Sequence, residues 1–477
     1  MPFKRPLVGA AVDEVRGIDL GDARLDARVR RFVAALERNP AAGFPAAVST
    51  VAEREAIYRL LGNGRVTLDA LLAPHVQQTV RRAAGCGARP LVLIDKTAFV
   101  FAGESDRDGL TRLGRGRQGF EAFVALAVSP AREPLGVLAV QPLEGNGGVS
   151  AAETWAQTVA AAEAPVRAWQ PIYVMDREAD AYTLFAALIA GGRDFVVRVA
   201  KDRWGHEHAD AAKELVRAVV ARTPVRLQRT VRLARRTGVG KARAARRRQP
   251  PREGREATLA VRACSVVVPR PAKLAGAWPA ALSVNLVQVV EEQPPADGVP
   301  VEWLLMTTLP ITTPTEVETV VDHYRARWTI EEYFKALKSG CAYEKRQLES
   351  RATLLTALGI LAPLAWRLLA LRSVAEDQAA PATAVLEADE LHVLRQISRE
   401  RPLGPTVTAA EALYAIARLG GHFPQNGRPG WKVLWIGFHK LFERVEGYRL
   451  ARAELTRPRK ASDVSQRPGA QSGNGNI

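Results

Sequence analysis

Apolar positions recur with two different periods along the chain, and the change of period divides it into helical and strand-rich regions. Near the N-terminus an apolar residue occurs every three or four positions over Asp22–Glu37 and again over Ser49–Leu61, which is the spacing of amphipathic helices. The second run begins with polar residues that can cap a helix. Residues 1–70 are therefore predicted to be entirely helical.

Between residues 71 and 203 the apolar runs become shorter and more continuous, as in strands that are buried within a sheet. The first three are predicted to be consecutive antiparallel strands. The two later runs are separated by helical patterns, which favours crossover connections. The predicted strands are Leu91–Ala102, Gly119–Pro130, Leu135–Leu143, Ile172–Asp176 and Phe195–Val199.

Residues 204–300 interrupt this alternation of strands and helices. Apolar and polar residues alternate in stretches such as ATLAVRACSVVV and LSVNLVQVV, which is the period of antiparallel strands. A strand at Trp303–Thr307 and a helix over Thr315–Lys338 then restore the earlier pattern. Residues 204–300 are therefore predicted to be a β-rich insertion.

The rest of the chain is predicted to be helical. Thr353–Arg372 is very apolar and is expected to pack behind the helix that precedes it. Residues 458–477 contain Ser, Gly, Asn and Pro without an apolar run, which is typical of disorder. The predicted fold class is α/β. It has a helical domain at 1–70, a mixed sheet flanked by helices at 71–375, with the insertion at about 204–300, and a helical domain at 376–457.

Composition narrows the class of partner. A net charge of +17 and a pI of about 10.2 indicate a polyanionic partner, with nucleic acid ahead of a membrane surface. Cys86, Cys264 and Cys341 form no CxxC motif, so reduced thiols are expected. The start MPFKRPLVGA lacks the apolar core of a signal peptide, and we find no run of the ~18 apolar residues that a membrane helix needs. A cytoplasmic protein that acts on DNA without a membrane partner is expected.

Basic residues are concentrated in one part of the insertion. Arg226–Arg255 holds about a dozen Arg and Lys in a stretch that also contains Pro and Gly. It can be a long hairpin that reaches DNA, or a disordered loop, because like charges repel one another. The two interpretations are compatible if the loop becomes ordered on DNA.

Candidate chemistry is concentrated in the helix His323–Lys338. With Tyr324 at zero and roughly 100° per residue, Arg327 lies near about −60°, Glu331 near about −20° and Lys338 near about −40°. One acid among cations and a phenol suits a site for phosphate and a divalent metal. A solvated face with ion pairs between successive turns would give the same stripe. The apolar residues expected to pack on the core lie opposite: Ala326, Ile330, Tyr333 and Leu337.

Two further acids stand at the ends of predicted strands. The run LVLID ends at Asp95, and the run PIYVMD ends at Asp176. Strand ends are where an open α/β sheet places ligand chemistry, so Asp95, Asp176 and Glu331 are predicted to converge. Three oxygen ligands without His or Cys favour magnesium or manganese over zinc.

These motifs resemble a known family. The order Tyr, Arg, Glu, Lys from Tyr324 to Lys338 resembles the signature of insertion-sequence DDE transposases of the IS-four type, the group that includes the Tn-five transposase. The stretches DREAD at 176–180, FVVR at 195–198, WLL at 303–305 and YAIARLGG at 414–421 resemble the same group in order and spacing. The resemblance extends from about Gly21 to about Gly447.

The resemblance implies an RNase H-like catalytic core that uses two Mg²⁺ ions, with Mn²⁺ able to substitute. Asp95 would contact both ions, while Asp176 and Glu331 would each hold one. The groups that contact the phosphates of DNA would be Tyr324, Arg327 and Lys338.

A pocket for a flipped DNA base is also implied. Trp303 takes the place of the aromatic residue that stacks on this base, and Arg198 that of an arginine beside it. The alternative is that Trp303 is a core residue of its strand. Ala200 stands where the family has a cation, and the adjacent Lys201 is the candidate for that contact.

The two helical domains have implied roles as well. The N-terminal domain would recognise the ends of the element, although a helical bundle with solvated arginines remains the alternative; its candidate DNA contacts are Arg24, Arg28, Arg31, Arg54 and Tyr58. The C-terminal domain would join two subunits into a homodimer. The candidate surface, which could equally be an internal core, comprises Leu434, Ile436, Phe438, Leu441 and Phe442.

The predicted function is cut-and-paste DNA transposition, with strand nicking, hairpin formation and resolution, and 3′-hydroxyl transfer into target DNA. Two other classes remain open. A metal nuclease or resolvase would need no Trp303 pocket, no end-recognition domain and no long basic insertion. A non-catalytic DNA-binding relative would be expected to lack one of the acids or the N-terminal region.

Overall fold

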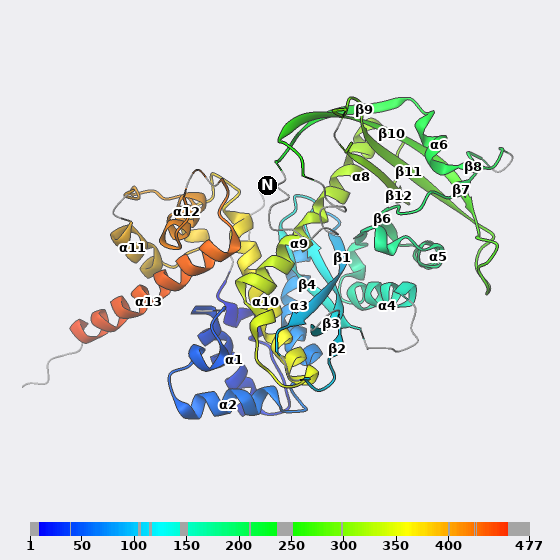
Figure 1. Cartoon of the computed structure of the whole chain (residues 1–477). Helices are drawn as coiled ribbons and strands as arrows, with labels where there is room; N and C mark the ends of the chain where they lie inside the picture. Colours follow the sequence, from blue (N-terminus) through cyan, green and yellow to red (C-terminus); the bar gives the residue numbers. More distant parts are fainter. Residues whose placement is uncertain are drawn as a thin grey trace, which may run out of the picture.

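The computed structural model describes residues 9–38, 40–103, 106–113, 117–143, 151–208, 211–235, 251–296, 299–398, 401–423, 425 and 427–456. A mixed sheet runs through the molecule, with helices packed along it (Figure 1). In this view the N-terminal and C-terminal helices lie at one end, and the strands of the insertion lie at the other. The fold is therefore mixed α/β, as the apolar periodicity predicts.

The N-terminal segment is helical because its apolar stripe has a core to cover. Leu25, Val29 and Leu36 are all buried. Thr50 and Glu53 form a capping box that starts the second helix, as the polar residues there predict. The elements are η1 (Ala11–Val15), α1 (Ala23–Arg38), η2 (Phe44–Ala47), α2 (Val51–Leu61) and α3 (Leu68–Ala84).

The central strands form the order β4-β3-β1-β5-β6. The first three in the chain are an antiparallel meander, and the next two run parallel to β1, as in an RNase H-like core. A short strand, β2, also pairs with β3. The strands are β1 (Leu91–Phe101), β2 (Thr111–Arg112), β3 (Gln118–Val128), β4 (Pro134–Pro142), β5 (Ile172–Met175) and β6 (Asp194–Arg198).

Side chains alternate along β1, so the strand contributes to two separate hydrophobic clusters. Leu91, Leu93 and Phe99 belong to the cluster that contains α10 (Arg351–Val374), whereas Val92 and Ile94 belong to the one that contains α4 and α5. The helices on this second face are α4 (Ala151–Glu163), η3 (Arg167–Trp169), η4 (Arg177–Ala179) and α5 (Tyr182–Ala190). Both faces of the central sheet are thus covered.

Three long strands of the insertion extend the central sheet, whereas two short ones, β7 and β8, form a separate two-stranded sheet. β12 pairs antiparallel with β6, and β11, β10 and β9 follow outward in that order. Within the basic stretch, β9 pairs antiparallel with β10, and residues 236–250 lie outside the described residues. The elements are β7 (Trp204–Gly205), β8 (Glu214–Leu215), α6 (Val216–Ala221), β9 (Val225–Leu233), β10 (Arg255–Pro269), β11 (Ala281–Glu291) and β12 (Glu302–Thr307).

The helix predicted over Thr315–Lys338 is broken twice. α8 (Pro314–Ala326) begins with a capping box at Thr313, and Arg327 separates it from α9 (Trp328–Lys335). A π-helical turn, η5 (Ala336–Gly340), and the short η6 (Tyr343–Lys345) follow. The apolar face behaves as predicted, because the following residues are fully buried: Ala326, Ile330, Tyr333 and Leu337.

α10 (Arg351–Val374) is the core helix behind this segment. In the part of the chain that the structure describes, α10 is long and apolar enough to cross a membrane by length and composition. This corrects the expectation that the chain contains no apolar run of membrane-spanning length. However, 89% of its most apolar window is buried inside the protein. Packing against the sheet and against α3 therefore accounts for its composition.

The C-terminal elements are η7 (Ala382–Ala384), α11 (Ala388–Ile397), α12 (Ala409–Leu419) and α13 (Trp431–Thr456). α13 crosses α12 so closely that a Cβ at Gly437 would lie 1.8 Å from the carbonyl oxygen of Ile416. Leu434, Phe438 and Leu441 are buried between these helices. The apolar pattern suggested as a surface between subunits is therefore wrong for these three residues, because they form the core of their own domain.

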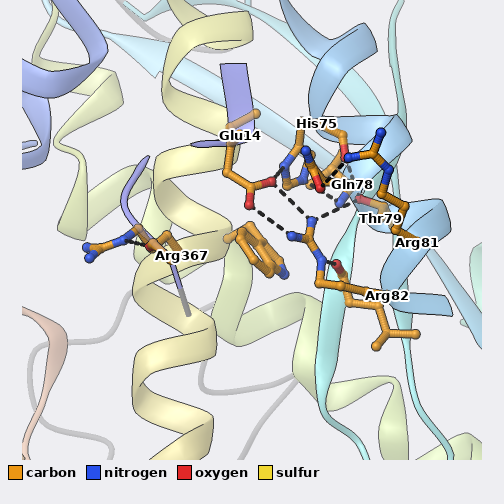
Figure 2. Close-up of polar contacts among 12 residues, drawn as sticks. Glu14, His75, Gln78, Thr79, Arg81, Arg82 and Arg367 are labelled. Carbon is orange, nitrogen blue, oxygen red and sulfur yellow. Dashed lines mark hydrogen bonds and ion pairs between the residues drawn. The ribbon is translucent and has the colours of Figure 1, made fainter. Parts of the chain in front are cut away.

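A buried polar network attaches η1 to the rest of the protein (Figure 2). Arg82 of α3 donates two hydrogen bonds to Glu14, at 2.8 and 3.1 Å, and its guanidinium lies 3.8 Å from the ring centre of Trp366. His75 donates from Nδ1 to Glu14 at 2.5 Å, while its Nε2 accepts from the backbone N–H of Val137 at 3.0 Å. An accepting Nε2 makes this histidine neutral, so the charge that balances Glu14 belongs to Arg82.

Candidate active site

Two of the predicted acids lie side by side because of the register of two parallel strands. Ile94 of β1 is paired with Met175 of β5. The residues that follow these two in the sequence are Asp95 and Asp176. Asp95 is 9% exposed. Asp176 ends its strand and caps η4 by accepting from the N–H of Glu178 at 2.7 Å. Asp95 lies within β1, which continues to Phe101, so the prediction that this acid ends its strand is wrong. The parallel pairing of β1 with β5 still brings the two carboxylates together.

The third acid, Glu331, comes from α9, which packs against β1. Arg327 donates to Asp95 at 2.7 Å and to Glu331 at 3.4 Å. A single guanidinium therefore bridges an acid of the sheet and an acid of the helix. The structure brings these groups together although 232 positions separate Arg327 from Asp95 along the chain.

The negative charge of the three acids is only partly compensated by Arg327. Burial raises the pKa of Asp95 to about 7, with further increases from Asp176 and Glu331, and Arg327 offsets only part of the effect. Burial also raises the pKa of Asp176. Like charges held in a desolvated site resist ionisation, and a divalent cation would relieve that cost.

The side chains of Asp95, Asp176 and Glu331 suit a hard cation, because all three offer carboxylate oxygens as ligands. The negative charge of Asp95 is also only partly compensated by Arg327. As they stand, however, no three Asp, Glu, His or Cys side chains in the described ranges lie close enough together to hold one ion. Arg327 takes the place between Asp95 and Glu331.

Lys338 lies in η5, the π-helical turn that follows α9, and its side chain also contacts β1. Its amine donates to the carbonyl of Ala98 at 2.7 Å and lies 3.7 Å from Glu344. Burial lowers the pKa of this lysine, while Glu344 and Glu331 raise it. Glu344 also accepts from the N–H of Val100 at 3.1 Å, so it fixes the lysine relative to β1. Sequence reasoning did not identify this contact of Glu344, because the residue lies outside the Tyr324–Lys338 motif.

Tyr324, which is predicted to contact a phosphate of DNA, is buried in the structure. The residue is 6% exposed, and its ring meets Trp303 edge-on at 5.2 Å. Burial raises its pKa, and the charges of Arg327 and Arg198 lower it. Arg198 itself donates to the carbonyl of Glu302 at 3.2 Å. Tyr324, Trp303 and Arg198 therefore form one group beside the acids.

Trp303 is one wall of a cavity of about 180 Å³ between α8 and the outer strands. The lining is largely apolar, with charged groups from Arg229, Glu318 and Arg325. Such a cavity can receive a flat apolar group and contact its polar edge.

Asp180 is a residue that sequence reasoning missed, although it closes the DREAD motif. Its side chain is 1% exposed and forms an ion pair with Arg203. The same carboxylate accepts from the N–H groups of Ala200 and Lys201, at 2.7 and 3.0 Å. It therefore ties the loop after β6, which carries the exposed Lys201, to the loop that carries Asp176.

The predicted N-terminal cations lie on the surface and outside this cluster. Arg24, Arg31 and Arg54 are exposed, and Arg28 is half-buried. Tyr58 is 48% exposed, which is high for an aromatic residue. These positions are open to a polyanion.

Comparison with known families identifies both parts. Residues 87–366, more than half of the chain, match the family described as Transposase DDE domain, and residues 9–66 match Transposase DNA-binding. Among solved structures, the chain is similar to the piggyBac transposase in a synaptic complex with hairpin DNA. That match has 10% identity and a TM-score of 0.36, and it covers 96% of this chain and 81% of that one. The chain belongs to the DDE-domain transposases and carries an N-terminal transposase DNA-binding domain.

Proposed function

We propose that this protein is an insertion-sequence transposase of the IS-four type, similar to the Tn-five transposase, that excises and inserts its element by cut-and-paste chemistry. The observation that carries the proposal is the convergence of Asp95, Asp176 and Glu331 around Arg327. One buried acid with a raised pKa, two acidic neighbours and one arginine that bridges two of the acids suit a site that accepts metal and phosphate together.

In this proposal Asp95, Asp176 and Glu331 hold two Mg²⁺ ions, for which Mn²⁺ can substitute. Ions held by these three carboxylates would supply Lewis-acid activation of the attacking oxygen and stabilisation of the leaving oxygen. Arg327 moves from Asp95 to a phosphate, where its planar fork can bind two oxygens. Lys338 provides a second positive charge beside the same strand.

Hairpin formation requires the DNA to bend sharply at the cut, and a base that leaves the stack relieves this strain. We place the base against Trp303, in the cavity of about 180 Å³. Stacking on an aromatic side chain contributes about 1–3 kcal/mol, comparable to the few kcal/mol that unstacking costs. Arg198 and Lys201 would lie beside the flipped base, and Tyr324 would contact a phosphate.

The partner is double-stranded DNA, as element ends and as target. Arg24, Arg28, Arg31, Arg54 and Tyr58 of the N-terminal domain contact the ends. A homodimer pairs the two ends, because one cluster of acids acts on one end at a time. The protein works in the cytoplasm, at the bacterial nucleoid when it is bound to DNA.

The test uses the purified full chain, Mg²⁺ and DNA that flanks its own gene. We expect hairpin-ended donor fragments and joined target DNA. Asp95→Asn, Asp176→Asn and Glu331→Gln should each lower cleavage by at least about 10³-fold while end binding stays within about twofold. The control is Asp106→Asn, an acid that is 78% exposed. Nicked DNA without hairpins or joining would indicate a metal nuclease instead, and normal cleavage by any acid variant would remove that residue from the site.

A further inference from the structure

The helix that carries Glu331 is short and depends on its neighbours for orientation. α9 has eight residues, with the break at Arg327 before it and a π-helical turn after it. A helix of this length is marginal by itself. Its buried residues, Ile330, Tyr333 and Phe334, fix its depth against the core. The rotation of α9 about its own axis then depends on the contacts of its polar side chains.

Glu332, the residue next to Glu331, is bound by three different elements. Its carboxylate accepts from Arg372 near the end of α10 at 2.9 Å, and from the indole N–H of Trp431 at 3.1 Å. Lys335 of its own helix donates at 2.7 Å. A glutamate on a solvated helix face ordinarily pairs only within its own helix, whereas Glu332 is anchored to distant parts of the chain.

Trp431 is the first residue of α13 and is itself firmly placed. It is 9% exposed, and the guanidinium of Arg372 lies 4.7 Å from its ring centre. Its ring also packs on the π-turn, since a Cβ at Gly340 would lie 4.0 Å from it. The close crossing of α12 and α13 at Gly437 then ties Trp431 to the core of the C-terminal domain.

We propose that Glu332 is a positioning residue that couples the docked C-terminal domain to the metal-binding carboxylate of Glu331. The connection runs from α13 through Trp431 to Glu332 and across one peptide to Glu331. It rests on the proposed function, in which Glu331 holds a metal ion. The C-terminal domain thus supports the active site within each subunit, in addition to any part that it plays in pairing two subunits.

The experiment compares Trp431→Phe, which keeps the ring and removes the N–H donor, with Glu332→Gln, which keeps an acceptor and removes the charge. The control is Trp435→Phe, the same change one turn further along α13. Three quantities are measured: thermal stability, the Mg²⁺ concentration that gives half-maximal cleavage, and hydrogen exchange of the α9 amides in the protein alone. The last reports on the helix without DNA or metal.

We expect Trp431→Phe and Glu332→Gln to raise the half-saturating Mg²⁺ concentration by about tenfold. Exchange of the α9 amides should become several-fold faster, with end binding unchanged. Trp435→Phe should behave as the wild type. Wild-type metal dependence and α9 exchange in both variants would overturn the inference. If Trp431→Phe fails to fold, Glu332→Gln decides alone. If Glu331→Gln itself cleaves normally, the proposed function fails instead, so the two failures are distinguishable.

Discussion

Glu14→Gln tests whether the network in Figure 2 holds the DNA-binding segment onto the catalytic domain. The side chain of Glu14 is 7% exposed and has one full positive charge, Arg82, beside it. Burial by itself would raise the pKa of Glu14, but His75 and Arg82 outweigh it and lower the pKa from 4.5 to about 2. The variant removes the negative charge and leaves Arg82 buried without a counter-ion.

The magnitude follows from that shift. A decrease of roughly 2.5 pKa units corresponds to about 3 kcal/mol at 1.36 kcal/mol per unit, which agrees with the ~3–5 kcal/mol lost when one member of a buried pair is removed. Because the pKa in the folded protein is below the pKa in the unfolded chain, this stability is fully present above about pH 4.5. It is lost as the pH falls toward about 2.

The assay is urea unfolding of wild type and variants between neutral pH and about pH 3. The difference in free energy of unfolding between wild type and Glu14→Gln should be about 3 kcal/mol at neutral pH and should shrink below pH 4.5. The control is Asp13→Asn, on the same η1 helix. Its ion-pair partner Arg16 is 76% exposed, so the change should cost roughly 0–1 kcal/mol. A Glu14→Gln effect as small as the control, or one that does not change with pH, would refute the reasoning.

Three further outcomes are expected. Asp180→Asn should lower cleavage by about tenfold with little change in end binding, because Arg203 and the loop bearing Lys201 lose their charged anchor; cleavage at the wild-type rate would deny it a positioning role. Replacing the exposed Leu450 and Leu455 of α13 by Asp should leave the fold intact and abolish pairing of two ends in gel-shift and light-scattering measurements, unless the subunits meet elsewhere. The logarithm of the DNA dissociation constant should rise steeply with the logarithm of salt concentration, since a chain of charge +17 displaces many counterions; a flat plot would contradict the phosphate contacts.

The sequence by itself determined the features that depend on local spacing. The apolar period fixes which face of α1 is buried, and the apolar runs fix β1, which contains Asp95, and β5, which Asp176 follows. Parallel pairing of two such strands then places Asp95 beside Asp176 almost without further information. The buried face of α9 follows in the same way, because a helical period of 3.6 residues defines it before any contact forms.

Only the tertiary structure decided which distant groups meet. The pairing of Glu14 with His75 spans 61 positions, and that of Glu332 with Trp431 spans 99. Neither residue type nor local period singles out such pairs, because many acids and cations along the chain could pair equally well. The same is true of Leu434, Phe438 and Leu441, whose apolar pattern is identical for a subunit interface and for an internal core. Whether a face is covered depends on the packing of other helices, and no local stretch of sequence contains that information.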